Sequence, residues 1–200
     1  AKASDWYYYS PYEYIYDYEN LNWYDYFLVR GYAFISSAGL GTKGSEGFNT
    51  TGSDLEINAF KNIIEWVNGK RKAYTDKTSN VEIKADWATG NVAMTGLSWA
   101  GTTTFGVAAT GVEGLKTIGP AAGIASWYDY FNSQGTQFGN APYSDLSWLS
   151  LYVSTRMLDQ ADWAGIWQNY ANYINQLNKD QNAHERNYSD VWKERDYTLN

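Results

Sequence analysis

Short apolar runs alternate with helical patterns between residues 32 and 125, and this alternation limits the folds open to the chain. The apolar runs occupy residues 32–37, 91–95 and 121–125, and helical patterns at residues 53–67 and 100–110 separate them. Consecutive strands joined by helices form parallel sheets with right-handed crossovers. The sequence therefore predicts an α/β protein with a mostly parallel sheet and flanking helices.

The pattern at residues 53–67 is the clearest helical one. Ser53 and Glu56 have the spacing of a capping box. An apolar stripe follows at helical spacing, made of Ile57, Phe60, Ile63, Ile64 and Val67. Gly69 stands where a C-terminal glycine is common.

The pattern changes after Trp127. Helical stripes replace the alternation, and no strand is evident from Asn132 onward. The stripes consist of Leu146, Leu149, Val153 and Met157, then Trp163, Trp167, Tyr170, Ile174 and Leu177, then Val191 and Trp192. We expect residues 1–130 to form a sheet-containing segment and residues 131–200 a helical layer.

A possible nucleophile lies between the second strand and the second helix, in the sequence Gly-Leu-Ser-Trp-Ala-Gly at residues 96–101. A nucleophile elbow needs a serine in a strained strand-to-helix turn, with small residues near it to avoid backbone collisions. Ser98 meets this pattern, and the helix amides after it favour developing negative charge. The alternative is a tight turn whose small residues serve packing alone.

The base that such a serine requires is not evident. His184 is the one histidine of the chain and lies in a polar segment with no strand before it. A catalytic base in this architecture normally follows a late strand, so we expect His184 to be a solvated residue of the helical layer.

Composition excludes several classes of function. The net charge of −7 disfavours a nucleic-acid partner, and the absence of cysteine excludes disulfides and thiolate zinc sites. Residues 92–112 carry no charge but are too rich in threonine and glycine for a membrane span. Aromatic residues make up 18% of the chain, with 10 Trp and 19 Tyr. Such rings build either a core or a ligand pocket, and composition does not decide between them.

The chain resembles the X-prolyl dipeptidyl aminopeptidases, which are serine peptidases of the α/β-hydrolase fold. The resemblance is nearly continuous from about Trp23 to Trp127 and weaker toward the end. Its marks are Asp25-Tyr26-Phe27, Arg30-Gly31-Tyr32, Gly39-Leu40-Gly41-Thr42, Gly44-Ser45-Glu46-Gly47, Lys84-Ala85-Asp86-Trp87, the 96–101 elbow, Thr110-Gly111-Val112-Glu113-Gly114-Leu115 and Ser126-Trp127-Tyr128-Asp129-Tyr130. It implies a partial α/β-hydrolase core at residues 1–130 and a helical cap at residues 131–200.

The resemblance implies a role for three residues at the reaction centre. Ser98 would be the acylating nucleophile, and the backbone amide of Trp99 would be one oxyanion donor. The hydroxyl of Tyr12, in Ser10-Pro11-Tyr12, would be the second donor. The alternative for Tyr12 is one packed aromatic ring among the many tyrosines before residue 33.

The resemblance also implies a substrate pocket. Trp127 and Tyr130 would hold the proline ring of the substrate, with core packing as the alternative for each. A cap glutamate of the family, which binds the substrate ammonium, is replaced here by Ser144. Either the neighbouring Asp145 takes over this role, or the preference for a free N-terminus is weakened.

The expected function follows from these correspondences. It is a serine exopeptidase acting on peptides with proline at the second position, without metal or cofactor. The acid and base, an Asp and a His, would lie in the same polypeptide beyond Asn200, so the 200 residues alone would be nearly inactive. The resemblance implies a cytoplasmic location, leaves a secreted or cell-surface one open, and is compatible with a homodimer.

The sequence leaves two other functions open. One is a cocaine-esterase-like hydrolase acting on acyl or amino esters, which the replaced cap glutamate suggests. The other is a non-catalytic module whose exposed rings bind sugars or proline-rich peptides.

Overall fold

The computed structural model describes residues 23–133, 136–137, 145–154 and 160–199. The chain divides into two compact units, residues 1–37 and residues 38–200. In the first unit, helix α2 (Trp23–Leu28) is followed by Gly31, which has φ of 82°. The predicted buried strand at 32–37 is wrong, because these residues are exposed and form no strand. An apolar run becomes a strand only where a neighbouring strand pairs with its backbone.

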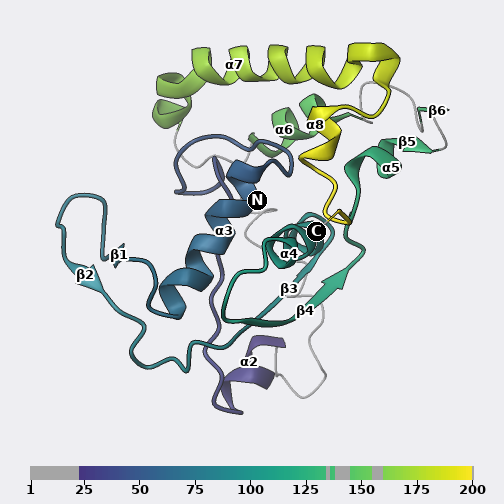
Figure 1. Ribbon diagram of the computed structural model, residues 1–200. Helices are drawn as coiled ribbons and strands as arrows, with labels where there is room; N and C mark the ends of the chain where they lie inside the picture. The colour runs from purple at the N-terminus through teal and green to yellow at the C-terminus, as the bar shows by residue number, and fades with distance from the viewer. Residues whose placement is uncertain (1–22, 134–135, 138–144, 155–159, 200) are drawn as a thin grey trace. The chain divides into compact units, whose positions relative to one another are not determined.

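The centre of the second unit is a pair of parallel strands, β3 (Val92–Leu97) and β4 (Leu115–Ala121). Helix α4 (Trp99–Ala109) connects them and packs against both (Figure 1). The mixed α/β class with a small parallel sheet is thus confirmed. The start of the last strand was predicted six residues too late. Lys116, Gly119 and Pro120 interrupt the apolar residues of β4, so it does not form an apolar run in the sequence.

Helix α3 (Asp54–Val67) covers α4 with the predicted apolar stripe. Ile57 and Ile64 are buried with Val107 of α4 and Val112, and Phe60 packs against this cluster. The cluster joins α3 to the sheet through Val92, Met94 and Leu115. Its packing fixes the position of the helix that carries Glu56.

The capping box at the start of α3 is wrong in detail. Ser53 is the N-cap but makes no side-chain capping bond, and its hydroxyl lies 2.6 Å from that of Thr50. The Glu56 carboxylate accepts the backbone N–H of Gly52, one residue before the cap, at 2.7 Å. Glu56 is turned inward rather than toward solvent.

Helices dominate the rest of the second unit, as predicted. They are α5 (Trp127–Phe131), α6 (Leu146–Ser154), α7 (Gln160–Asn182), the 3₁₀ helix η2 (Ala183–Arg186) and α8 (Asp190–Lys193). A second buried cluster holds α5 to α8 together through Trp127, Phe131, Leu146, Leu177 and Trp192. Helix α7 lies along α6 and α8 (Figure 1). The boundary at residue 130 between a core segment and a cap stays a prediction.

Two short hairpins complete the second unit. Strands β1 (Ala73–Tyr74) and β2 (Glu82–Ile83) pair antiparallel, as do β5 (Asn132–Ser133) and β6 (Thr136–Gln137). The expectation of no strand after Asn132 is therefore wrong. Strands of two residues depend on a single turn and leave no periodic pattern in the sequence.

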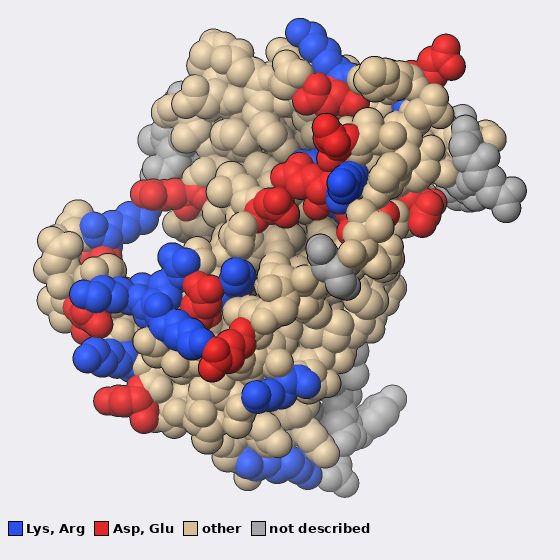
Figure 2. Space-filling model, in the orientation of Figure 1, with Lys and Arg blue, Asp and Glu red and all other residues tan. Residues whose placement is uncertain are grey.

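Charged side chains gather on the side of the molecule that carries β1 and β2, where basic and acidic groups are mixed (Figure 2). The ion pairs there join Lys70 to Glu113, Arg71 to Glu65, Lys72 to Glu82 and Lys77 to Glu46. These cations are neutralised locally. Among the described helices, none is long and apolar enough to cross a membrane.

Candidate active site

The backbone of Ser98 is strained. With φ of 59° and ψ of −116°, it lies in a region that residues other than glycine rarely adopt. The strand and helix on either side hold it there: Ser98 donates its N–H to Ala121 O of β4 at 2.8 Å, and its carbonyl accepts the N–H of Thr102 at 2.9 Å. The side chain is exposed at the end of β3. This is the geometry that the elbow pattern predicts.

Two glycines make the turn sterically possible. A Cβ on Gly96 would lie 2.5 Å from Ala100, and a Cβ on Gly101 would lie 2.6 Å from the carbonyl oxygen of Ala121. Neither contact is tolerated between real atoms. The small residues around Ser98 therefore allow both the turn and the close approach of α4 to β4.

A pocket of about 120 Å³ opens beside Ser98. Its lining is mainly apolar and aromatic and comes from α4, the loop after β4, α5 and α6: Ser98, Trp99, Thr102, Ala122, Ile124, Trp127, Tyr130 and Leu149. A small, uncharged pocket with aromatic, aliphatic and hydroxyl side chains next to a strained serine can hold a compact, uncharged group.

The structure brings Trp127 and Tyr130 together with Ser98, and the two differ in burial. Trp127 is only 1% exposed and stacks on Phe131, so it is a core residue that also lines the pocket. Tyr130 is 56% exposed and meets Trp127 edge-on at 6.4 Å between ring centres. Trp127 therefore belongs to the core and also lines the pocket, and a role for either ring in holding a proline stays a prediction.

Trp99 is the first residue of α4, so its backbone N–H has no acceptor within the helix. A role for this N–H as an oxyanion donor stays a prediction. The Trp99 ring contacts Trp127 edge-on at 5.5 Å, and its indole N–H donates to Glu56 Oε1 at 2.7 Å.

Glu56 is a buried carboxyl group that the sequence pattern did not identify. Its side chain is 1% exposed and accepts N–H groups of Asn49, Gly52 and Trp99. Burial raises the pKa of Glu56, while these bonds and the charge of Arg195 act in the opposite direction. Only a capping-box spacing marked Glu56 in the sequence, and this spacing predicted a role at the start of the helix.

Asp145 is used by the fold. Its Oδ1 accepts the backbone N–H of Trp148 at 2.6 Å and the hydroxyl of Ser147 at 2.9 Å, so it caps α6. It is not among the residues that line the pocket. A role in binding the substrate amine stays a prediction, and both Ser144 and Tyr12 lie outside the described residues.

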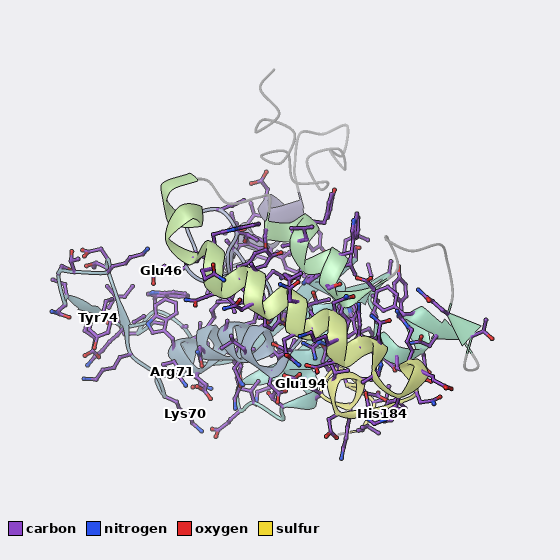
Figure 3. All side chains as sticks on the ribbon, turned by 90° about the horizontal axis from the view of Figure 1, so that it is seen from above. Glu46, Lys70, Arg71, Tyr74, His184 and Glu194 are labelled. Carbon is purple, nitrogen blue, oxygen red and sulfur yellow. The ribbon has the colours of Figure 1, made fainter. Side chains whose placement is uncertain are left out.

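His184 is exposed, as expected, and lies just beyond the end of α7 (Figure 3). It is not part of the pocket lining. Within the described part of the chain, no group of three or more His, Cys, Asp or Glu is placed to hold a metal ion.

Comparison with known proteins identifies the family. The family model described as X-Pro dipeptidyl-peptidase (S15 family) matches residues 2–200. The chain belongs to this family. Xaa-Pro dipeptidyl-peptidases of Streptococcus gordonii and Streptococcus sanguinis are each 41% identical over 177 residues, which is 88% of this chain. That of Pediococcus pentosaceus is 41% identical over 178 residues.

The match covers a limited part of these relatives. The chain spans 23% of the length of the two streptococcal peptidases and 22% of the Pediococcus one. The elbow, the pocket and the helices after it therefore correspond to less than a quarter of the length of these relatives.

Proposed function

We propose that the full-length polypeptide containing this chain is a serine exopeptidase that releases N-terminal Xaa-Pro dipeptides. The observation that supports this most strongly is the strained, exposed Ser98 between β3 and α4, with an apolar pocket beside it. Membership of the family adds to it, since the similar relatives are named Xaa-Pro dipeptidyl-peptidase. We further propose that the chain forms part of an α/β-hydrolase fold, with residues 131–200 as its cap.

In the proposed mechanism, Ser98 Oγ attacks the carbonyl carbon of the substrate's proline residue. Its proton passes to a histidine supplied, with an aspartate, by the rest of the polypeptide. The tetrahedral oxyanion accepts the N–H of Trp99 and the hydroxyl of Tyr12, which stabilise charge present only in the transition state. Collapse expels the amine, which takes the proton, and water then hydrolyses the acyl-enzyme.

The pocket supports a preference for proline in this mechanism. A pyrrolidine ring is compact, flat and uncharged, and it fits a lining of indole, phenol and aliphatic side chains. No charged side chain is among the lining residues of the described pocket. Selection in such a site depends on shape.

An acetylated substrate tests the exopeptidase function against the esterase alternative. We expect the full-length enzyme to hydrolyse Gly-Pro p-nitroanilide about 10–100 times faster, by kcat/KM, than its N-acetyl form, because acetylation removes a charge-assisted hydrogen bond. The capping role of Asp145 is the observation that favours the alternative, since it leaves this carboxylate partly occupied. Equal rates with both substrates, together with faster hydrolysis of the matching ester, would support an ester hydrolase.

Replacing Tyr130 by alanine tests the pocket. We expect KM for Gly-Pro p-nitroanilide to rise about tenfold, because one aromatic wall is worth about 0.5–1.5 kcal/mol beyond its buried area. Stability should change little, since Tyr130 is 56% exposed. Tyr74→Ala on β1 is the matched control, since Tyr74 is also exposed (46%) and lies outside the pocket. An unchanged KM in Tyr130→Ala would place the proline ring elsewhere.

A further inference from the structure

Glu56 is costly to bury, so its position calls for an explanation. A carboxyl group loses several kcal/mol of hydration when it is taken into a protein interior, by general estimates. The α3 helix buries it to 1% exposure beside the apolar stripe that begins at Ile57. A leucine would fill a similar space without this cost. What a leucine could not provide is the pair of carboxylate oxygens, which accept hydrogen bonds.

Its two oxygens accept three N–H groups from two parts of the chain. Oε1 accepts from Asn49 Nδ2 at 3.0 Å and from Trp99 Nε1 at 2.7 Å, and Oε2 accepts from Gly52 N at 2.7 Å. Asn49 and Gly52 belong to the loop before α3, whereas Trp99 begins α4. Through Glu56, the loop and α3 are tied to the residue that follows Ser98.

Trp99 occupies a central place in the site. It is the first residue of α4 and follows Ser98 directly. Its ring contacts Trp127, and the residue lines the pocket. The bond to Glu56 anchors the ring at its only polar atom. A ring fixed at this point limits movement of both the amide and the pocket wall.

We propose that Glu56 is a positioning residue for the nucleophile elbow, acting through the Trp99 indole. This inference rests on the proposed peptidase function. The carboxylate does not touch substrate; it holds Trp99 so that its amide and its ring keep their places relative to Ser98. A shift of about 1 Å in such groups can cost a hundredfold in rate.

The test is a double-mutant cycle in the full-length enzyme, with Glu56→Gln and Trp99→Phe. Glutamine has the shape of glutamate, but its amide group must turn an N–H toward at least one of the three donors. Phenylalanine keeps an aromatic ring and removes the indole N–H. We expect each variant to lower kcat for Gly-Pro p-nitroanilide about 10–100-fold, with KM changed less than about threefold. The double variant should be no slower than the slower single one.

Ile64→Ala is the matched control for loss of stability. Ile64 lies on the same helix, is 3% exposed, and packs in the cluster with Val107 rather than against Trp99. We expect it to lower stability and to leave kcat within about twofold at temperatures where the protein is folded. A similar fall in kcat in Ile64→Ala would show that Glu56 acts through stability alone.

The outcomes separate this inference from the proposed function. Fully additive losses in the two Glu56 and Trp99 variants, or wild-type kcat in Glu56→Gln, would overturn the positioning role. Retained turnover in Ser98→Ala would overturn the peptidase function itself. An inactive Ser98→Ala alongside a fully active Glu56→Gln removes only the positioning role.

Discussion

Replacing Ser98 by alanine is expected to lower kcat for Gly-Pro p-nitroanilide by about 10⁶-fold in the full-length enzyme, the size of loss seen when a serine nucleophile is removed. The reason is that the acyl-enzyme cannot form without the hydroxyl. Release of nitroaniline by the purified variant, compared with wild type, measures the effect. Ser79→Ala is the control, because Ser79 is exposed in the β1–β2 hairpin and should keep full activity. A Ser98→Ala enzyme that still turns over would contradict the assignment.

The strain at Ser98 adds a second measurement to the same experiment. Alanine keeps the unfavourable backbone at φ of 59° and ψ of −116°, whereas glycine adopts it freely. Ser98→Gly should therefore be inactive like Ser98→Ala, yet about 1 kcal/mol more stable, since strain of about 1–3 kcal/mol is relieved and glycine entropy offsets part of the gain. Native-state hydrogen exchange of the α4 amides compares the two. Equal stability would mean that the turn stores no strain.

Gly52→Ala is expected to cause a large loss of stability for a single added methyl group. Gly52 has φ of +73°, and a Cβ there would lie 2.4 Å from Trp127 Nε1 and 2.5 Å from the Tyr197 hydroxyl. These atoms cannot yield easily: Trp127 is 1% exposed and donates to Tyr197, whose hydroxyl donates to Gly52 O at 2.6 Å. Burial raises the pKa of Tyr197, so the phenol stays a donor.

The expected loss has two parts, about 1–2 kcal/mol for a left-handed backbone and about 1–3 kcal/mol for overpacking. Gly47→Ala separates them, because Gly47 has φ of +79° and nothing within 4 Å of its Cβ position. It should lose only the first part. Hydrogen exchange of the α3 and α4 amides in both variants measures the difference. Equal losses would mean that Trp127 and Tyr197 move aside without cost.

The elbow was predictable because its requirements are local. A serine between a strand and a helix, with glycines at 96 and 101, satisfies steric conditions that involve few neighbours. The stripe from Ile57 to Val67 was predictable for the same reason, since helical periodicity is a property of one segment.

Other features depend on residues far apart in the chain. Ser53 and Glu56 have capping-box spacing, but Glu56 bonds instead to Trp99, 43 residues away. Strand β4 begins six residues before the apolar run at 121–125. Its position depends on pairing with β3 and not on an apolar composition of its own. Residues 32–37 have the composition of a strand, but the described structure assigns them to none.

The sequence alone determined the order of strand, serine turn and helix, and the class of the fold, because backbone sterics and side-chain periodicity act over a few residues. Only the tertiary structure decided that Glu56 is buried and bonded to Trp99, that Trp127 is both core and pocket wall, and that Asp145 caps α6. Burial and hydrogen bonding are relations between distant segments, and they exist only once the chain has folded.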